Sequence, residues 1–402
     1  MVLGLFEYQR IESSESKILK KAKGAKKMEI THFGLEEWLN KWEKEAVYDL
    51  AQSSIEALTL EELIGLDGTT VTDFFQSLSK TSLDYGWSEG TATFKKEVAS
   101  LYQSLSSENI IQTNGATGAN LLALYGLIEP GDHVVSMLPT YQQLYDLPKS
   151  LGATVDFVPL TEEEEWRFDS VKLVDVIQPN TKMICLNSAN NPTGTLLDRQ
   201  TLEEIIEIAE KVDAYILMDE VYAPLAGGDF VSIVDLYDKG ITTNSLSKTY
   251  SVPGIRIGWV AANQEIIERL RKYHTYLVLS GGVLSDALAV HALRNKEKIL
   301  ARNKKIVSDN LAIVEKWLAD EPNVQLVLPN HVSTSFIRLN ITEDDEQFCI
   351  DLLRETGVLL VPGSAYGVPQ HARLGYCCKK ETLEKGLALL SEYLKERGNN
   401  KV

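Results

Sequence analysis

The segment "SLSKTYSVPGIRIGWV" (residues 245–260) places a lysine and an arginine among mostly apolar neighbours. Lys248 follows two serines, Ser245 and Ser247, and Arg256 comes eight residues later between two isoleucines. A lysine amine can form a Schiff base with an aldehyde, and a guanidinium can bind a phosphate. A single ligand with both groups would use both residues, so other segments should supply its remaining contacts.

Further polar residues follow apolar segments that are typical of β-strands. Asp219 and Tyr222 follow "YILM", and Asn191 follows "KMICLN" within "SANNPTG". Ligands of open α/β sheets bind at the carboxyl ends of the strands. Taken alone, Asn191 before a proline is typical of a turn, and Asp219 could be a solvated loop acid. A carboxylate buried at a strand end needs a partner, because an unpaired buried charge is very costly.

Small residues follow the strand-like "IIQ" in the segment "TNGATGANL" and open a helical pattern. Gly115, Ala116 and Thr117 stand at the expected helix N-terminus. Free backbone N–H groups and the helix dipole suit a phosphate there. A tight turn is the alternative for this segment when it is considered by itself.

One ligand accounts for all of these residues together, and it is pyridoxal 5′-phosphate. Lysine binds its aldehyde, aspartate keeps its ring nitrogen protonated, and tyrosine and asparagine donate to its ring oxygen. Arginine and helix-end amides hold its phosphate. We therefore predict that Lys248 binds the aldehyde end of this cofactor and Arg256 the phosphate end, with Asp219 at the ring nitrogen.

The elements that must position these residues alternate between strand and helix from about residue 90 to 290. The strand-like runs are "HVVSML", "TVDFVPL", "KMICLN", "YILMDEVY", "ITTNSL" and "GWVAA". In the clearest helix, "TLEEIIEIAEKV", we expect a capping box of Thr201 and Glu204. Its apolar face is Leu202, Ile205, Ile206, Ala209 and Val212. This alternation predicts an α/β fold whose mostly parallel sheet is covered by helices on both faces.

The two ends of the chain have a different pattern. The N-terminal part is mainly helical, with a second capping box at Thr59 and Glu62. The C-terminal part has a long helix, strands around "VSTSFIRL" and "GVLLVPG", and a last helix with the stripe Leu383, Leu387, Leu390 and Leu394. The predicted division is a flexible basic extension (1–27), a smaller α+β domain (28–75 with 300–402) and a large cofactor domain (76–299).

Composition excludes several classes of protein. The 402 residues carry 40 basic and 57 acidic side chains, and the formal net charge of −17 disfavours nucleic acid as a partner. The four cysteines show neither zinc spacing nor a disulfide framework, so we expect no metal site and a reducing, cytoplasmic location. No apolar run approaches the roughly 20 residues of a membrane helix.

The chain resembles the fold-type I pyridoxal-phosphate enzymes of the class I/II aminotransferase family. The resemblance rests on "NNPTG", "DEVY", "SLSKTYSVPGIRIGW" and "VPGSAYG…ARLGY", which have the family's order and spacing within residues 30–398. It implies a seven-stranded, mostly parallel sheet in the large domain. It also implies that the protein moves the amino group of an α-amino acid to a 2-oxo acid through a Schiff base on Lys248.

The resemblance further implies a role for each site residue. Lys248 would also act as general base and acid, and Arg373 would clamp the substrate α-carboxylate beside Asn191. Tyr85 would reach the phosphate of a neighbouring subunit, which makes the expected active unit a homodimer. The implied cofactor contacts are Asp219 at the ring nitrogen, Tyr222 and Asn191 at the ring oxygen, Tyr141 on the ring face, and Gly115, Ala116, Thr117, Ser245, Ser247 and Arg256 at the phosphate.

The same motifs serve other reactions on this scaffold. Lyases, cyclases and synthases that form a cyclopropane ring, as in ACC synthase, use β- or γ-elimination or cyclisation. Transamination is favoured because it is the family's commonest activity. A non-catalytic regulatory protein is disfavoured, because Lys248, Asp219 and Arg373 are all present.

One segment departs from relatives that use dicarboxylic substrates. Those enzymes often bring a second arginine from the neighbouring subunit, but residues 273–290 here contain neither arginine nor lysine. His274 is the only possible cation in the segment, and a structural role suits it better. The segment before "YDLAQSSIEALTLEEL", which ordinarily supplies part of the substrate pocket, is also unlike the family pattern. We therefore expect neutral or basic amino acids to be better substrates than aspartate.

Overall fold

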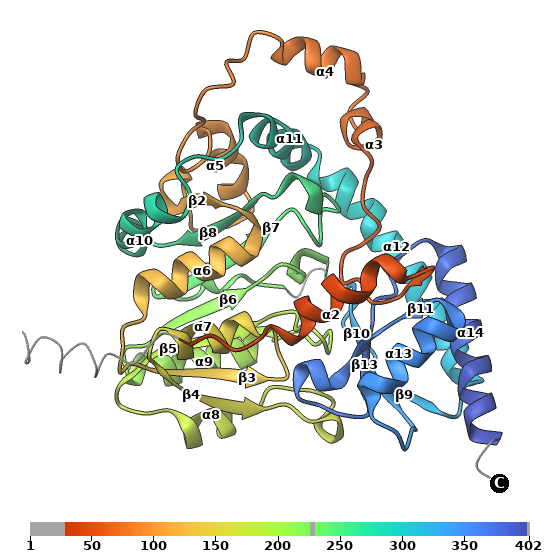
Figure 1. Ribbon diagram of the computed structural model, residues 1–402. Coiled ribbons are helices and arrows are strands. Elements are labelled where there is room, and N and C mark those ends of the chain that lie inside the picture. Colours follow the sequence, from red (N-terminus) through yellow and green to blue (C-terminus); the bar gives the residue numbers. More distant parts are fainter. Residues whose placement is uncertain (1–28, 226–229, 400–402) are drawn as a thin grey trace, which may run out of the picture.

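The computed structural model describes residues 29–225 and 230–399, so the predicted extension 1–27 lies outside the described residues. A seven-stranded sheet has the order β2-β8-β7-β6-β5-β3-β4 (Figure 1). Its strands are β2 (Ile110–Thr113), β3 (His133–Leu138), β4 (Thr154–Pro159), β5 (Thr181–Asn187), β6 (Tyr215–Asp219), β7 (Gly240–Ser245) and β8 (Gly258–Ala262). Only β8 runs antiparallel to its neighbours within this sheet. The predicted seven-stranded, mostly parallel sheet is confirmed.

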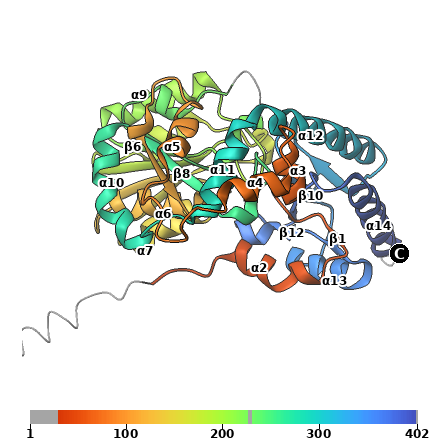
Figure 2. The same ribbon diagram turned by 90° about the horizontal axis from the view of Figure 1, so that it is seen from above.

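Helices cover both faces of this sheet, because successive strand residues point to opposite sides (Figure 2). Met183 and Cys185 of β5 pack with α6, α7 and α10, whereas Ile184 and Leu186 belong to the cluster that contains α9. The helices are α5 (Ala92–Ala99), α6 (Gly115–Leu127), α7 (Gln143–Ser150), α8 (Ser170–Val176), α9 (Arg199–Lys211), α10 (Gln264–Leu277) and α11 (Val283–Arg294). The near-continuous apolar strands are those of a sheet buried on both faces.

Helix α9 corrects one sequence prediction. The helix begins at Arg199, and its N-cap is Asp198, whose carboxylate accepts a hydrogen bond from the Thr201 amide at 2.8 Å. Thr201 therefore lies inside the helix, and Glu204 accepts a hydrogen bond from Ser170 instead. The predicted capping box of Thr201 and Glu204 is wrong, because an aspartate three residues upstream caps the same amide.

The second predicted capping box is correct. Thr59 and Glu62 exchange side-chain hydrogen bonds with each other's amides at the start of α3 (Leu60–Gly65). Helix α4 (Val71–Leu78) follows, and α3 packs against α11. Since Leu63 of α3 shares a cluster with Phe94 and Trp259, this part of residues 28–75 lies against the predicted large domain. The predicted domain boundaries therefore stay a prediction.

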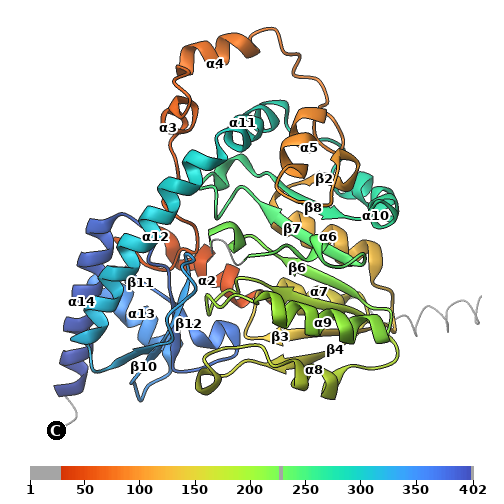
Figure 3. The same cartoon turned by 180° about the vertical axis from the view of Figure 1, so that it is seen from behind.

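A smaller four-stranded antiparallel sheet has the order β12-β13-β10-β9. It belongs to the C-terminal part of the chain, where Figure 3 labels β10 and β12. Segments from both ends of the chain meet beside it, because β1 (Tyr48–Asp49) pairs in parallel with β11 (Val358–Leu359). The other elements of this part are β9 (Val324–Leu326), β10 (Ser335–Leu339), β12 (Val361–Pro362), β13 (His371–Leu374), α12 (Lys296–Ala319), α13 (Asp345–Thr356) and α14 (Lys380–Asn399). The predicted leucine stripe of α14 is buried.

Helix α2 (Gly34–Trp42) lies between the two parts (Figures 1 and 2). At one end the Gly34 amide donates to Oε1 of Gln142, and further along Nε1 of Trp38 donates to the carbonyl of Leu360, both at 2.9 Å. Short 3₁₀ helices occupy Glu43–Glu45, Ser107–Asn109, Glu162–Glu164, Ala223–Leu225, Ile233–Asp235, Pro253–Ile255 and Gly363–Tyr366. No helix among the described residues is long and apolar enough to cross a membrane.

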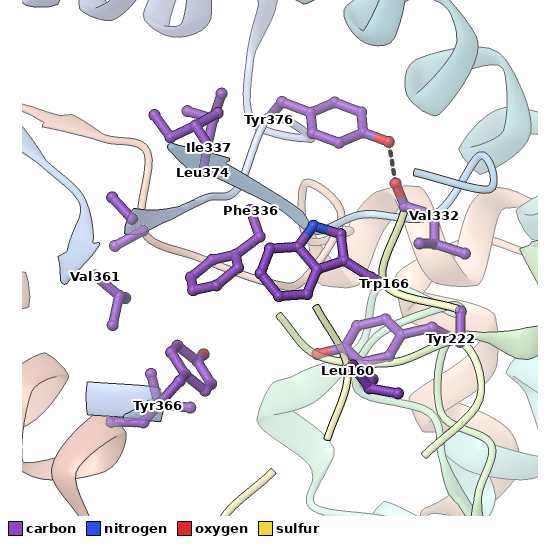
Figure 4. Packing of buried hydrophobic residues seen from close by; sticks show 14 of the residues in the cluster. Leu160, Trp166, Tyr222, Val332, Phe336, Ile337, Val361, Tyr366, Leu374 and Tyr376 are labelled. Carbon is purple, nitrogen blue, oxygen red and sulfur yellow. Dashed lines mark hydrogen bonds between the residues drawn. The ribbon is translucent and has the colours of Figure 1, made fainter. Parts of the chain in front are cut away.

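An aromatic cluster contains residues from both parts, including Trp166, Phe336 and Tyr366 (Figure 4). The rings of Trp166 and Phe336 lie 5.6 Å apart, and Tyr366 packs on Phe336 at 5.9 Å. Phe336 of β10 is the register partner of Arg373 of β13. The cluster therefore gives the strand that carries Arg373 a rigid support.

Candidate active site

A cavity of about 240 Å³ opens at the carboxyl ends of β5, β6 and β7. Most of the predicted site residues line it, namely Ala116, Thr117, Tyr141, Asn191, Asp219, Tyr222, Ser245, Ser247, Lys248, Arg256 and Arg373. Gly115 lies directly beside Arg256, whereas Tyr85 lies elsewhere on the surface. The strand-end argument and the family resemblance together therefore predicted residues that the fold brings together, although their roles stay predictions.

One end of the cavity presents donors that suit a phosphate. Helix α6 begins at Gly115, whose φ of 70° is left-handed, and a Cβ there would lie 2.5 Å from Nη2 of Arg256. The Arg256 guanidinium donates to the Pro253 carbonyl at 2.9 Å and to Oγ of Ser247 at 3.4 Å. Glycine thus lets the arginine approach the helix N-terminus, where amide groups and a cation can share one anion.

Lys248 lines the cavity and donates from Nζ to Oγ of Ser53 at 2.8 Å. Burial, followed by the charge of Arg373, lowers the pKa of Lys248 to about 8. A larger fraction of the amine is therefore neutral near physiological pH than in a solvated lysine. A neutral amine is the form that attacks an aldehyde or accepts a proton.

Asp219 is almost fully buried and is held by two donors. Nδ2 of Asn120 donates to its Oδ2 at 2.8 Å, and the Val221 amide donates to its Oδ1 at 3.3 Å. Burial raises the pKa of Asp219 to about 6 despite these hydrogen bonds. A cationic N–H group bound next to this carboxylate would favour its charged form.

Arg373 also lines the cavity and is 1% exposed. It donates to the Tyr366 hydroxyl at 2.7 Å, to Oδ1 of Asn191 at 3.2 Å and to the Ala51 carbonyl at 2.5 Å. Its Nε has no partner, and no carboxylate among the described residues forms an ion pair with it. Because a buried cation without an anion is costly, this side of the cavity suits a carboxylate ligand.

The tyrosines of the cavity keep their protons. Burial raises the pKa of both Tyr222 and Tyr141 well above the usual range. The Tyr141 hydroxyl donates to Oε1 of Glu36 at 3.2 Å. Both hydroxyl groups are therefore hydrogen-bond donors at neutral pH, as the predicted contact of Tyr222 with a ring oxygen requires.

Tyr85 is the predicted site residue that this chain does not bring to the cavity. Its side chain is 78% exposed and borders a surface hollow with Trp87 and Gly281. A residue that acts on a neighbouring subunit must be exposed in the isolated chain, so the prediction for Tyr85 stays open.

Sequence reasoning missed several residues of the site. Asn120 holds Asp219 and stands four residues after Ala116, so helical periodicity could have placed both on one face. Tyr366 belongs to the motif "VPGSAYG". Glu36 and Ser53 line the cavity from the N-terminal segment, and no local pattern there indicates it.

The α/β fold and a cavity with these lysine, aspartate and arginine side chains define a pyridoxal-phosphate enzyme of fold type I. Residues 57–390 match the family model described as aminotransferase class I and II. The chain belongs to this family and is a pyridoxal-phosphate-dependent aminotransferase.

Individual relatives agree with the family. The crystal structure of a PLP-dependent aminotransferase from Streptococcus suis 89-1591 is 54% identical, covers 92% of this chain and 99% of its own, and superposes with a TM-score of 0.90. Aspartate aminotransferase from Pyrococcus horikoshii is 30% identical over 84% of this chain and 92% of its own length. Capreomycidine synthase from Streptomyces vinaceus is 28% identical over 90% of this chain and 93% of its own.

Proposed function

We propose that Lys248, Asp219 and Arg373 carry out the transfer of an amino group from an α-amino acid to a 2-oxo acid in this protein. The observation that carries the proposal is the position of Arg373. It is a buried cation without a carboxylate partner among the described residues, and it lines the same cavity as Lys248. This arrangement suits a ligand that presents a carboxylate to the arginine and an amino group to the lysine.

The residues of the cavity fit pyridoxal phosphate in the predicted orientation. Arg256, Ser245, Ser247 and the first amides of α6 would hold the phosphate, and Asp219 would pair with the ring nitrogen. Tyr222 and Asn191 would donate to the ring oxygen, and Tyr141 would cover the ring face. When bound, the cofactor supplies an electron sink that stabilises negative charge at the substrate α-carbon.

The chain's own residues would then hold the substrate and move its proton. Arg373 would bind the α-carboxylate, while Tyr366 and Asn191 hold the guanidinium in place. Lys248, as the neutral amine, would remove the α-proton and return it. Its pKa of about 8 suits both directions of proton transfer near neutral pH.

We further propose a homodimer in the cytoplasm, with Tyr85 contacting the cofactor phosphate of the partner subunit. Leu83, Tyr85 and Trp87 are all largely exposed in this chain, and Leu284, which is also exposed, lines a surface hollow together with Leu83 and Tyr85. A group of exposed apolar side chains suits a protein interface. The free thiols of the described cysteines suit a reducing compartment.

Neutral or basic amino acids are the proposed substrates. His274, the only cation candidate in residues 273–290, is buried and bonded to the Gln112 carbonyl at 2.9 Å, and burial lowers its pKa. It is therefore unsuited to neutralise a second substrate carboxylate. The relative from Pyrococcus horikoshii is named an aspartate aminotransferase, but at 30% identity its side-chain specificity does not carry over by itself.

A second candidate activity is cyclisation or elimination on the same scaffold. The similarity to capreomycidine synthase over 90% of this chain favours keeping it. A panel of amino acids, followed by cofactor absorbance and ammonia release, separates the two. We expect amino acid consumption that requires a 2-oxo acid acceptor and releases no ammonia. Amino acid consumption without an acceptor would instead assign the second activity, with stoichiometric ammonia for elimination and no ammonia for cyclisation, because ring closure keeps the amino group on the product.

A further inference from the structure

One charged side chain of the cavity has no part in the scheme above. Glu36 of α2 lines the cavity together with Lys248, Asp219, Arg256 and Arg373. Each of the other four has a proposed partner on the cofactor or on the substrate α-carboxylate. The carboxylate of Glu36 therefore remains available to the part of the ligand that these residues do not bind, which is the substrate side chain.

The charge of Glu36 acts on two residues that the proposed scheme places at the substrate. Burial is the main cause of the raised pKa of Tyr366, about 12, and Glu36 adds to it. Glu36 also opposes the lowering of the Lys248 pKa that burial and Arg373 cause. The negative charge of Glu36 thus affects Lys248, where the α-amino group must react, and Tyr366, which holds Arg373.

Glu36 has unused capacity to bind a cation. Its hydrogen-bond donor is the Tyr141 hydroxyl at 3.2 Å, whereas a carboxylate can accept about four hydrogen bonds. No lysine, arginine or histidine within residues 29–225 and 230–399 forms an ion pair with it. Leu35 and Leu39 of the same helix line the cavity beside it. These apolar neighbours reduce solvent screening of the charge and would pack on an aliphatic chain.

We infer that Glu36 selects α-amino acids whose side chains end in a cationic group, such as an ammonium or a guanidinium. The inference rests on the proposed function, because it takes Arg373 as the site of the α-carboxylate. The side chains of Arg373 and Glu36 then bind the two ends of one substrate. The second carboxylate of aspartate or glutamate would meet Glu36 and be repelled, in addition to lacking a counter-charge.

A purely structural role for Glu36 makes a different prediction. If the carboxylate served only to hold Tyr141, its loss would weaken the binding and turnover of all amino acids to the same extent. Glu36→Gln separates the two roles, since glutamine keeps an oxygen that accepts from Tyr141 and has nearly the same size, but carries no charge. Glu37→Gln is the matched control, because Glu37 is the next residue of α2, is exposed and pairs with His32 outside the cavity.

The test compares L-lysine with L-norleucine, which has the same carbon chain without the ammonium group. Dissociation constants come from spectral titration of the cofactor-loaded protein, and kcat/KM from turnover. We expect wild type to favour lysine and Glu36→Gln to reduce that preference by at least about tenfold, as for the loss of one hydrogen bond to a charged group. The dissociation constant and kcat/KM for norleucine should change little in Glu36→Gln, and Glu37→Gln should behave as wild type for both amino acids.

Two results would overturn the inference while leaving the proposed function intact. The first is a wild-type protein that binds norleucine at least as tightly as lysine. The second is a Glu36→Gln variant that loses affinity and kcat/KM to the same extent for both amino acids. Failure of the proposed function looks different. In that case, the protein saturated with pyridoxal phosphate would carry no label on Lys248 after borohydride reduction, which would overturn both.

Discussion

Asn120 of α6 donates a hydrogen bond of 2.8 Å to the Asp219 carboxylate at the end of β6. Thr243 of β7 in turn donates to Oδ1 of Asn120 at 2.6 Å. The helix whose N-terminus is proposed to bind the cofactor phosphate therefore also orients the carboxylate proposed for the ring nitrogen. One helix thus contributes to both ends of the proposed cofactor site.

Asp219→Asn should keep the fold and cofactor binding but lower turnover. The two side chains are nearly the same size, but an amide does not keep a ring nitrogen protonated. We expect kcat to fall by on the order of a hundredfold to a thousandfold, the usual loss when one electrostatic stabiliser is removed. Steady-state kinetics and a thermal unfolding curve check both parts of this prediction.

Glu220→Gln is the control for that experiment. Glu220 is the next residue, is equally buried and accepts hydrogen bonds from Ser232. Burial raises the pKa of Glu220 to about 8, so the side chain is largely protonated at neutral pH and glutamine resembles it. Turnover should stay near wild type. An equal loss in both variants would mean that any change at this strand end disturbs the site.

Tyr366→Phe should weaken substrate binding more than cofactor binding. The hydroxyl accepts from Arg373 at 2.7 Å and donates to Asn191 at 3.0 Å, so its loss frees the guanidinium to move. We expect KM for the amino acid to rise about tenfold, as for one lost hydrogen bond to a charged group. The dissociation constant of the cofactor should stay unchanged. A loss of cofactor with no effect on KM would contradict the positioning role.

Mixed dimers test the proposed role of Tyr85. Lys248→Ala subunits and Tyr85→Ala subunits should each be impaired on their own. A dimer that contains one of each has one site with both native residues, if Tyr85 acts across the interface. Mixing after dissociation should therefore restore part of the activity. A mixture no more active than its components would place Tyr85 outside the site of the partner.

The rate of cofactor capture by cofactor-free protein should depend on pH through Lys248. The pKa of Lys248 is lowered to about 8, so the reactive neutral amine increases as the pH rises toward 8 and levels off above it. In an ordinary lysine, the fraction of neutral amine would keep increasing until about pH 10.4. Arg373→Met removes a cation that lowers this pKa and should move the midpoint upward. If both proteins show the same midpoint, the pH dependence would belong to a group on the free cofactor and not to Lys248.

The sequence predicts the centre of this site better than its rim. Lys248, Asp219 and Asn191 follow strands, and the ends of parallel strands meet at one edge of a sheet, so their proximity follows from the β/α pattern alone. Asn120 is also accessible to such reasoning, because it lies one helical turn beyond Ala116. The positions of these residues can therefore be predicted from the short-range pattern of strands and helices.

Glu36 and Ser53 are not predictable in this way. They reach the cavity because α2 is bonded to Gln142 on one side and Leu360 on the other, and because β1 pairs with β11. Such contacts join segments more than a hundred residues apart and leave no local pattern. The misplaced helix start at Thr201 has a different cause, since two capping residues compete within three positions and the structure uses Asp198.

The central claim is that Lys248 binds the aldehyde of pyridoxal phosphate, and covalent labelling tests it most directly. The purified protein is saturated with cofactor, reduced with borohydride, digested and analysed by peptide mass. The account predicts one labelled peptide, which contains Lys248, and no label in Lys248→Ala. A label on a different lysine, or no label in the saturated wild-type protein, would contradict it.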